Sequence, residues 1–143
     1  MKQVIILLAL CIFIAGCATL DSVRNENREN INKLSVGITK EQVQDIMGTE
    51  TKSAGAPLLV NVMSLGAAIT HSQKISNPYK IEVFKDKNGE TIEVWWYYTD
   101  IQSRDGAITD DELTPVLFKN NLVIGWGRSY LDNSVDKHEL KMR

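Results

Sequence analysis

The loop from Ile101 to Glu112 carries oxygen-bearing side chains at spacings that suit a calcium ion. A twelve-residue calcium loop takes ligands from its first, third, fifth and twelfth positions and needs glycine at the sixth for a sharp turn. With Gly106 at the sixth position, Ser103, Asp105 and Glu112 occupy the third, fifth and twelfth. Ile101, at the first position, has no side-chain oxygen, and the flanking segments have strand-like patterns. A polar β-turn loop is therefore the favoured interpretation, and a calcium-binding module through residues 101–112 is an alternative function.

No other group of residues has spacing that suits catalysis. Asp110 and Asp111 are adjacent, and neighbouring side chains on a strand or turn point apart, so spacing alone does not pair them. His71 lies in an apolar stretch and His138 in a polar one. The sequence contains no Ser-His-Asp order, glycine-rich phosphate loop or zinc-type histidine spacing. We therefore expect no enzymatic activity, no cofactor and no small-molecule substrate.

Four successive aromatic residues, Trp95 to Tyr98, fall within a strand-like segment. Side chains alternate between the two faces of a strand, so if Trp96 and Tyr98 pack on helices, Trp95 and Tyr97 lie on the opposite face. Large exposed aromatics mark binding surfaces, which makes Trp95 and Tyr97 a candidate surface. The alternative is that the chain covers both faces. Trp126 either belongs to the same surface or fills the core, and the core is favoured.

The N-terminal segment resembles a lipoprotein signal peptide. Lys2 precedes an uninterrupted apolar run at residues 4–14, which is too short to span a bilayer as a helix. The run ends at Ile14-Ala15-Gly16-Cys17, which resembles the lipobox cut by lipoprotein signal peptidase. We interpret residues 1–16 as the cleaved signal peptide and Cys17 as the lipidated residue, carrying palmitate-type acyl chains. An ordinary secretory signal or a short membrane anchor are the less favoured interpretations.

This assignment limits the remaining chemistry. Cys11 leaves with the signal peptide, so the mature chain keeps only Cys17 and has neither a disulfide nor a free thiol. Loss of Lys2 leaves 15 basic and 18 acidic residues, with no basic stripe, so we expect no nucleic-acid binding. Ala18 and Thr19 follow the cysteine without an aspartate, which in Gram-negative lipoproteins implies sorting to the outer membrane, facing the periplasm.

The elements that must position these residues begin with helices. We expect residues 17–30 to form a tether that becomes a helix from about Arg24. Thr39 and Gln42 have capping-box spacing and predict a helix at residues 40–47 that ends at Gly48. Residues 53–76 form an apolar insertion, either covering the core or touching lipid or a partner.

Strands follow. The alternation at residues 79–84 and 91–98 flanks the turn signal Asn88-Gly89, and strands at 115–119 and 122–126 flank Asn120-Asn121. Residues 132–143 read as a polar, frayed tail. We therefore predict an α+β domain at residues 31–131, with one or two N-terminal helices packed on a three- to four-stranded antiparallel β-meander.

This order of elements resembles the BamE/SmpA small outer-membrane lipoproteins and one repeat of the β-lactamase-inhibitor-protein fold, over roughly residues 31 to 127. The residues that carry the resemblance are the lipobox, Leu34-x-x-Gly37-x-Thr39-x-x-Gln42-Val43 and Met47-Gly48. The stretch from Asp105-Gly106 to Gly125-Trp126-Gly127 is most similar to an uncharacterised family of proteobacterial lipoproteins. The chain departs from the BamE pattern at Thr49-Glu50-Thr51, where a proline is usual, and in its apolar insertion.

The resemblance implies a non-enzymatic, lipid-anchored periplasmic module that binds envelope proteins, with a role in outer-membrane assembly or maintenance. Fold analogy also suggests an inhibitor of a secreted hydrolase.

Overall fold

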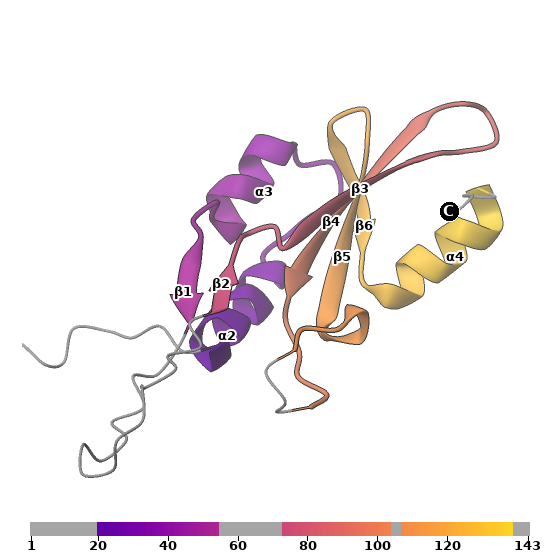
Figure 1. Ribbon diagram of the computed structural model, residues 1–143. Helices are drawn as coiled ribbons and strands as arrows, with labels where there is room; N and C mark the ends of the chain where they lie inside the picture. Colours follow the sequence, from indigo (N-terminus) through magenta and orange to yellow (C-terminus); the bar gives the residue numbers. More distant parts are fainter. Residues whose placement is uncertain (1–19, 55–72, 104–106, 139–143) are drawn as a thin grey trace, which may run out of the picture.

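A computed structural model describes residues 20–54, 73–103 and 107–138 of the protein (Figure 1). Its centre is a four-stranded antiparallel sheet in the order β3-β4-β5-β6, so that each strand pairs with the next one along the chain. The strands are β3 (Lys80–Lys85), β4 (Thr91–Tyr98), β5 (Leu113–Lys119) and β6 (Leu122–Trp126). Together with the helices, this meander confirms the predicted α+β fold class.

Both predicted hairpin turns are present. Gly89 has φ +78°, and the carboxylate of Asp86 accepts the backbone N–H groups of Asn88 and Glu90, each at 2.9 Å. Asn120 and Asn121 both have positive φ, at 51° and 67°, as a two-residue turn of type I′ requires. These turns set the register of β3 with β4 and of β5 with β6.

The described residues form three helices around the sheet: α2 (Leu20–Ile31), α3 (Lys40–Met47) and α4 (Arg128–His138). The predicted capping box starts α3, with Thr39 N–H donating to Gln42 Oε1 at 2.9 Å and Gln42 N–H donating to Thr39 Oγ1 at 3.4 Å. Figure 1 shows α3 and α4 on opposite sides of the sheet. No helix within the described ranges is long and apolar enough to cross a membrane.

The helices bury both faces of the sheet. One face, with Trp95 and Tyr97, packs against Val43 and Met47 of α3. The other face packs against Leu131 of α4 and Val23 of α2, through the side chains Ile92, Val94, Trp96 and Tyr98.

The tail prediction was wrong for residues 132–138, and residues 139–143 fall outside the described residues. Residues 132–138 continue α4 instead of forming a frayed segment, and Leu131 and Ser134 are buried. Because α4 covers the face that carries Trp96, while α3 covers the face that carries Trp95, neither face of β4 is free.

The N-terminal part of the domain is also more ordered than predicted. Helix α2 begins at Leu20 instead of near Arg24, and it buries Val23 and Asn27. The side-chain amides of Asn27 and Asn77 bond to each other, with Asn77 Nδ2 donating to Asn27 Oδ1 at 2.7 Å. Asn27 Nδ2 also donates to the Tyr98 carbonyl at 2.9 Å, and Asn77 Nδ2 to the Met47 carbonyl at 2.8 Å. This buried pair joins α2, α3 and β4.

The ends of the apolar insertion form a second, two-stranded sheet. β1 (Lys52–Ala54) pairs antiparallel with β2 (Gln73–Ile75), so that Lys52 lies opposite Ile75. Ile75 is buried in the core, and Lys52 Nζ lies 2.5 Å from Glu26 Oε2 of α2. The predictions for residues 55–72, including His71, and for residues 1–17, including Cys17, fall outside the described residues.

Candidate functional site

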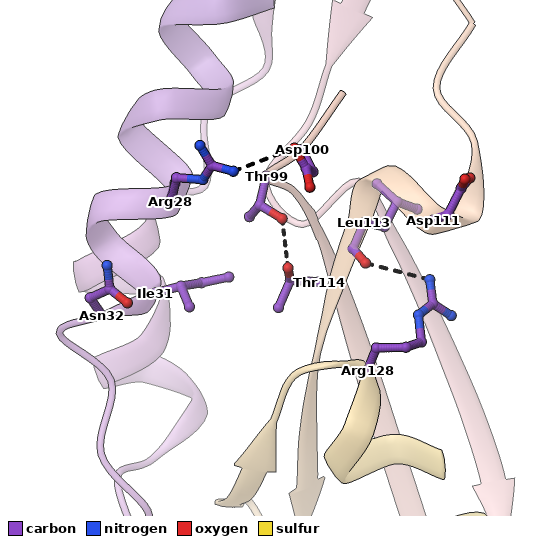
Figure 2. Close-up of a pocket in the computed structure, with 9 residues that line it drawn as sticks. All are labelled: Arg28, Ile31, Asn32, Thr99, Asp100, Asp111, Leu113, Thr114 and Arg128. Atoms are coloured by element: carbon purple, nitrogen blue, oxygen red, sulfur yellow. Dashed lines mark hydrogen bonds and ion pairs between the residues drawn. The ribbon is translucent and has the colours of Figure 1, made fainter. Parts of the chain in front are cut away.

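A cavity of about 330 Å³ lies at one end of the sheet, between α2 and the start of α4 (Figure 2). The short 3₁₀ helix η1 (Asp110–Glu112) leads from the preceding loop into β5 beside it. Its lining comes from α2 and the residue after it, the end of β4, η1, β5 and α4: Arg28, Ile31, Asn32, Thr99, Asp100, Asp111, Leu113, Thr114 and Arg128.

The two arginines approach the cavity from different elements. Arg28 Nη2 of α2 lies 3.4 Å from Asp100 Oδ1, and both side chains are about half exposed. Arg128 donates to the backbone carbonyls of Asp110 and Leu113, and its guanidinium carbon lies 4.8 Å from the centre of the Trp96 ring. The cavity therefore combines two fixed cations with nearby carboxylates and has little net charge.

Two of the remaining polar groups of the cavity bond to each other, and a third bonds to a neighbouring hydroxyl. Figure 2 shows the hydroxyl groups of Thr99 and Thr114 pointing toward each other, at 2.5 Å. Asp111 Oδ1 accepts the Thr109 hydroxyl at 2.5 Å, and this hydrogen bond holds the pKa of Asp111 below its ordinary value. The polar side chains thus stabilise the junction between α2, β4 and β5.

The hydroxyl groups of the cavity are engaged in hydrogen bonds. A hydroxyl becomes a nucleophile when a general base removes its proton. Here the two threonine hydroxyls are hydrogen-bonded to each other, and the lining carboxylates of Asp100 and Asp111 interact with Arg28 and with the Thr109 hydroxyl. Within the described ranges, no three His, Cys, Asp or Glu side chains are grouped so that they could hold a metal ion. The cavity can accept a small polar group, at the lower end of the volumes typical of ligand sites.

The loop for which calcium binding was the alternative interpretation is organised by one buried carboxylate. Glu112 is 2% exposed. Its Oε1 accepts the backbone N–H groups of Gln102 at 2.7 Å and Ser103 at 3.4 Å, and its Oε2 accepts that of Thr109 at 3.0 Å. The carboxylate thus ties both ends of the loop together, and both its oxygens face N–H donors. Glu112, a ligand in the calcium alternative, thus accepts hydrogen bonds from the loop backbone in this structure, while Asp105 falls outside the described residues.

The aromatic surface predicted from β4 is not exposed. Trp95 and Tyr97 are 4% and 0% exposed, and Trp126 is half-buried against the same core cluster. The Trp95 indole N–H donates to Glu93, whose carboxylate also lies 2.6 Å from Lys40 Nζ. These contacts place Trp95, Tyr97 and Trp126 between the sheet and α3. Strand alternation correctly placed Trp95 and Tyr97 on one face of the sheet and Trp96 and Tyr98 on the other. The sequence did not indicate that helices cover both faces.

The Tyr97 hydroxyl is a polar group inside this core. It is fully buried and has no hydrogen-bond partner among the residues that the structure describes. Burial raises the pKa of Tyr97 well above its ordinary value, so that the phenol stays protonated.

Two exposed apolar side chains lie next to each other on one face of the edge strand β3. Ile81 and Val83 are 52% and 60% exposed and lie two residues apart, on the same face of the strand. In the register of the sheet they lie opposite Trp95 and Glu93. The sequence pattern identified their alternation, but it did not indicate that β3 is an outer strand.

The fold and the cavity define a small α+β module whose four-stranded meander lies between helices. Residues 59–133 match the family described as "Protein of unknown function (DUF3192)". The match spans more than half of the chain, and the chain belongs to this family. It includes the main sheet, η1 and the first part of α4. No curated protein and no solved structure matches the chain.

Proposed function

We propose that the protein is a non-enzymatic binding or scaffold module of the cell envelope, held at the outer membrane by lipid on Cys17 and facing the periplasm. The observation that carries the proposal is the short distance along the chain between that cysteine and the folded domain. Helix α2 begins at Leu20, so only residues 18 and 19 separate it from Cys17. A lipid on Cys17 holds the domain directly at the membrane surface.

The helix that follows Cys17 in the sequence is packed firmly into the domain. Val23 and Asn27 of α2 are buried, and Asn27 bonds to the carbonyl of Tyr98 in β4. Two or more acyl chains give stable membrane attachment where a single chain does not. A scaffold needs such a fixed position relative to the bilayer.

The base of the apolar insertion lies beside α2. Lys52 of β1 pairs with Glu26, near the middle of α2. Residues 55–72 therefore join the domain beside the helix that follows Cys17 in the sequence. Since residues 54–70 carry no charge, this placement favours the membrane over the core as the surface that they meet.

Binding fits the described site better than catalysis does. The two threonine hydroxyls of the cavity are bonded to each other, Asp100 pairs with Arg28, and Arg128 donates to a backbone carbonyl. The role in outer-membrane assembly or maintenance rests on the resemblance to the BamE/SmpA lipoproteins, with which the helices and antiparallel meander are compatible. The partners are envelope proteins.

The proposal is tested with the full chain in a Gram-negative envelope, treated with a lysine-reactive crosslinker. We expect discrete adducts with envelope proteins in the membrane fraction, and we expect Cys17→Ser to lose both the adducts and the membrane association. Cys11→Ser is the matched control and should keep both, because Cys11 lies inside the signal peptide. Identical adducts from Cys17→Ser, or no adducts from the wild-type chain, would contradict the proposal.

A further inference from the structure

The backbone of β3 has hydrogen-bonding groups directed away from the sheet. At the end of the β3–β4 hairpin, Asp86 N–H donates to the Glu90 carbonyl at 2.9 Å, in the same register as the strand pairs. Hydrogen-bonded and non-hydrogen-bonded pairs alternate along an antiparallel ladder. Even-numbered residues of β3 therefore bond to β4, and the N–H and C=O groups of Ile81, Val83 and Lys85 point outward.

The opposite edge of the sheet, at β6, is covered by another segment of the chain. Val123 of β6 accepts the N–H of Gly37 at 2.8 Å and donates to the Ile38 carbonyl at 2.9 Å. Thr39 also forms a bridge with Leu122. The segment before α3 thus covers the edge at β6, whereas within the described ranges no segment pairs with the outer side of β3.

The side chains of β3 add specificity to this open edge. Ile81 and Val83 are more than half exposed. Lys85, next on the same face, bonds through Nζ to the Gly89 carbonyl at 3.3 Å and the Thr91 hydroxyl at 3.0 Å. Both of these groups are neutral, so the positive charge of Lys85 is available to a carboxylate. The edge presents two apolar side chains and one cation at alternate positions.

We propose that β3 binds an extended segment of another envelope protein as an added antiparallel strand. Main-chain hydrogen bonds supply affinity in this mode, and alternate side chains supply specificity. The partner segment would place apolar side chains opposite Ile81 and Val83 and an acidic one opposite Lys85. This inference rests on the proposed function as a binding module and names its contact surface.

A second copy of the chain is a poorer occupant in the register that places Ile81 opposite Val83. The two Glu82 side chains would then lie directly opposite each other, and like charges in that position destabilise a strand pair. In the register that places Ile81 opposite Ile81, Glu82 would lie opposite Lys80, which already pairs with Asp110 and Glu82 of its own chain. A partner segment with an acidic side chain opposite Lys85 is therefore the occupant that the charges of the edge favour.

The first test uses the full lipidated chain in detergent micelles and the synthetic peptide Thr-Glu-Thr-Val-Thr-Val-Thr. Run antiparallel, its glutamate lies opposite Lys85 and its valines opposite Val83 and Ile81. We expect the peptide to slow hydrogen exchange at the backbone amides of Ile81, Val83 and Lys85 by at least tenfold. The matched control peptide carries N-methyl groups on its glutamate and two valines, which keeps the side chains and removes the ladder donors. It should give no protection.

The second test changes the protein. Val83→Pro removes one outward N–H group, which an edge strand tolerates because its ladder to β4 does not use that group. We expect peptide affinity to fall at least tenfold, with the circular dichroism and the unfolding midpoint retained. Ile81→Lys should also weaken binding, and Val36→Lys is its control because Val36 is 66% exposed outside the sheet.

Three results would overturn the inference. The N-methylated peptide could bind as well as the parent peptide, or Val83→Pro could leave its affinity unchanged. The amides of Ile81 and Val83 could also be protected without peptide. Dependence of that protection on protein concentration would indicate a second copy, and independence would indicate a segment of the same chain. The proposed function is tested separately by the envelope adducts that depend on Cys17. If those adducts form while one of these three results is found, the inference about β3 fails and the proposed function stands.

Discussion

Replacing Glu112 with glutamine tests whether the buried carboxylate organises the loop at residues 101–112. Its two oxygens accept three backbone N–H groups, from Gln102, Ser103 and Thr109. Glutamine supplies one amide oxygen, which can keep the bonds to Gln102 and Ser103. Its NH₂ group would then face the N–H of Thr109, so two donors would oppose each other.

The magnitude follows from the bonds that change. A hydrogen bond to a charged acceptor contributes about 1.5–3 kcal/mol, and a buried donor without a partner costs about 1–3 kcal/mol. We therefore expect Glu112→Gln to lower the free energy of unfolding by roughly 2–4 kcal/mol. Urea unfolding followed by tryptophan fluorescence measures this, and hydrogen exchange should accelerate at Thr109.

The control and the calcium alternative belong to the same experiment. Asp111→Asn changes the neighbouring exposed carboxylate and should leave the unfolding midpoint nearly unchanged. Millimolar calcium should not raise the unfolding temperature of the wild-type chain. If calcium stabilises the wild-type chain and Glu112→Gln removes that effect, or if Glu112→Gln is as stable as wild type, the structural role assigned to Glu112 is refuted.

Three further substitutions test the core. Tyr97→Phe removes a buried hydroxyl without a described partner and should raise the free energy of unfolding by roughly 1 kcal/mol; a loss of similar size would show that the hydroxyl has a partner. Trp95→Ala should lower it by about 3–5 kcal/mol, the usual cost of truncating a buried tryptophan, whereas an exposed binding residue would show little change in the same denaturation assay. Lys40→Met tests the pH dependence: burial raises the pKa of Glu93, but the hydrogen bonds from Lys40 and Trp95 and the charge of Lys40 lower it further, so the net shift is downward from 4.5. A carboxylate whose pKa is lowered by folding stabilises the folded state at pH values above its ordinary pKa. This stability is lost as the pH falls through the folded-state pKa. The variant should therefore lose less stability than wild type between neutral pH and about pH 3.5, and equal losses in the two unfolding curves would count against this contribution of the pair.

Local signals predicted most of the fold. The helix at residues 40–47 depends on Thr39 and Gln42, which are close in sequence and bond to each other's backbone. The hairpins depend on Gly89 and on Asn120-Asn121, whose residue types suit positive φ. Such elements are predictable because the residues that determine them are neighbours in the chain.

Helix α4 and the burial of Trp95 depend on distant contacts. The segment at residues 128–138 is mostly polar, and its docking involves a few buried side chains, including Leu131 and Ser134. A Cβ at Gly125 would collide with the ring of Tyr130, so the glycine makes room for an aromatic side chain of α4. Neither the docking of α4 nor the contact between Gly125 and Tyr130 produces a periodic pattern in the sequence.

The candidate site was the least predictable part. Arg28 and Arg128 are a hundred residues apart in sequence, and only the order of the strands brings them to one cavity. Likewise, Ile81 and Val83 form an exposed surface because β3 is an edge strand, which is a property of the whole sheet. The role of Glu112 in holding the two ends of the loop together could be recognised only from the backbone N–H groups that it binds in the structure.

The modification of Cys17 tests the central claim most directly. The chain is isolated from Gram-negative membranes after growth with labelled palmitate, and its N-terminal peptide is analysed by mass spectrometry. We expect this peptide to begin at Cys17 and to carry acyl chains, in the wild-type protein and in Cys11→Ser, and we expect Cys17→Ser to be unlabelled. An unmodified Cys17, a mature N-terminus elsewhere, or label retained in Cys17→Ser would contradict the assignment of a lipid-anchored module.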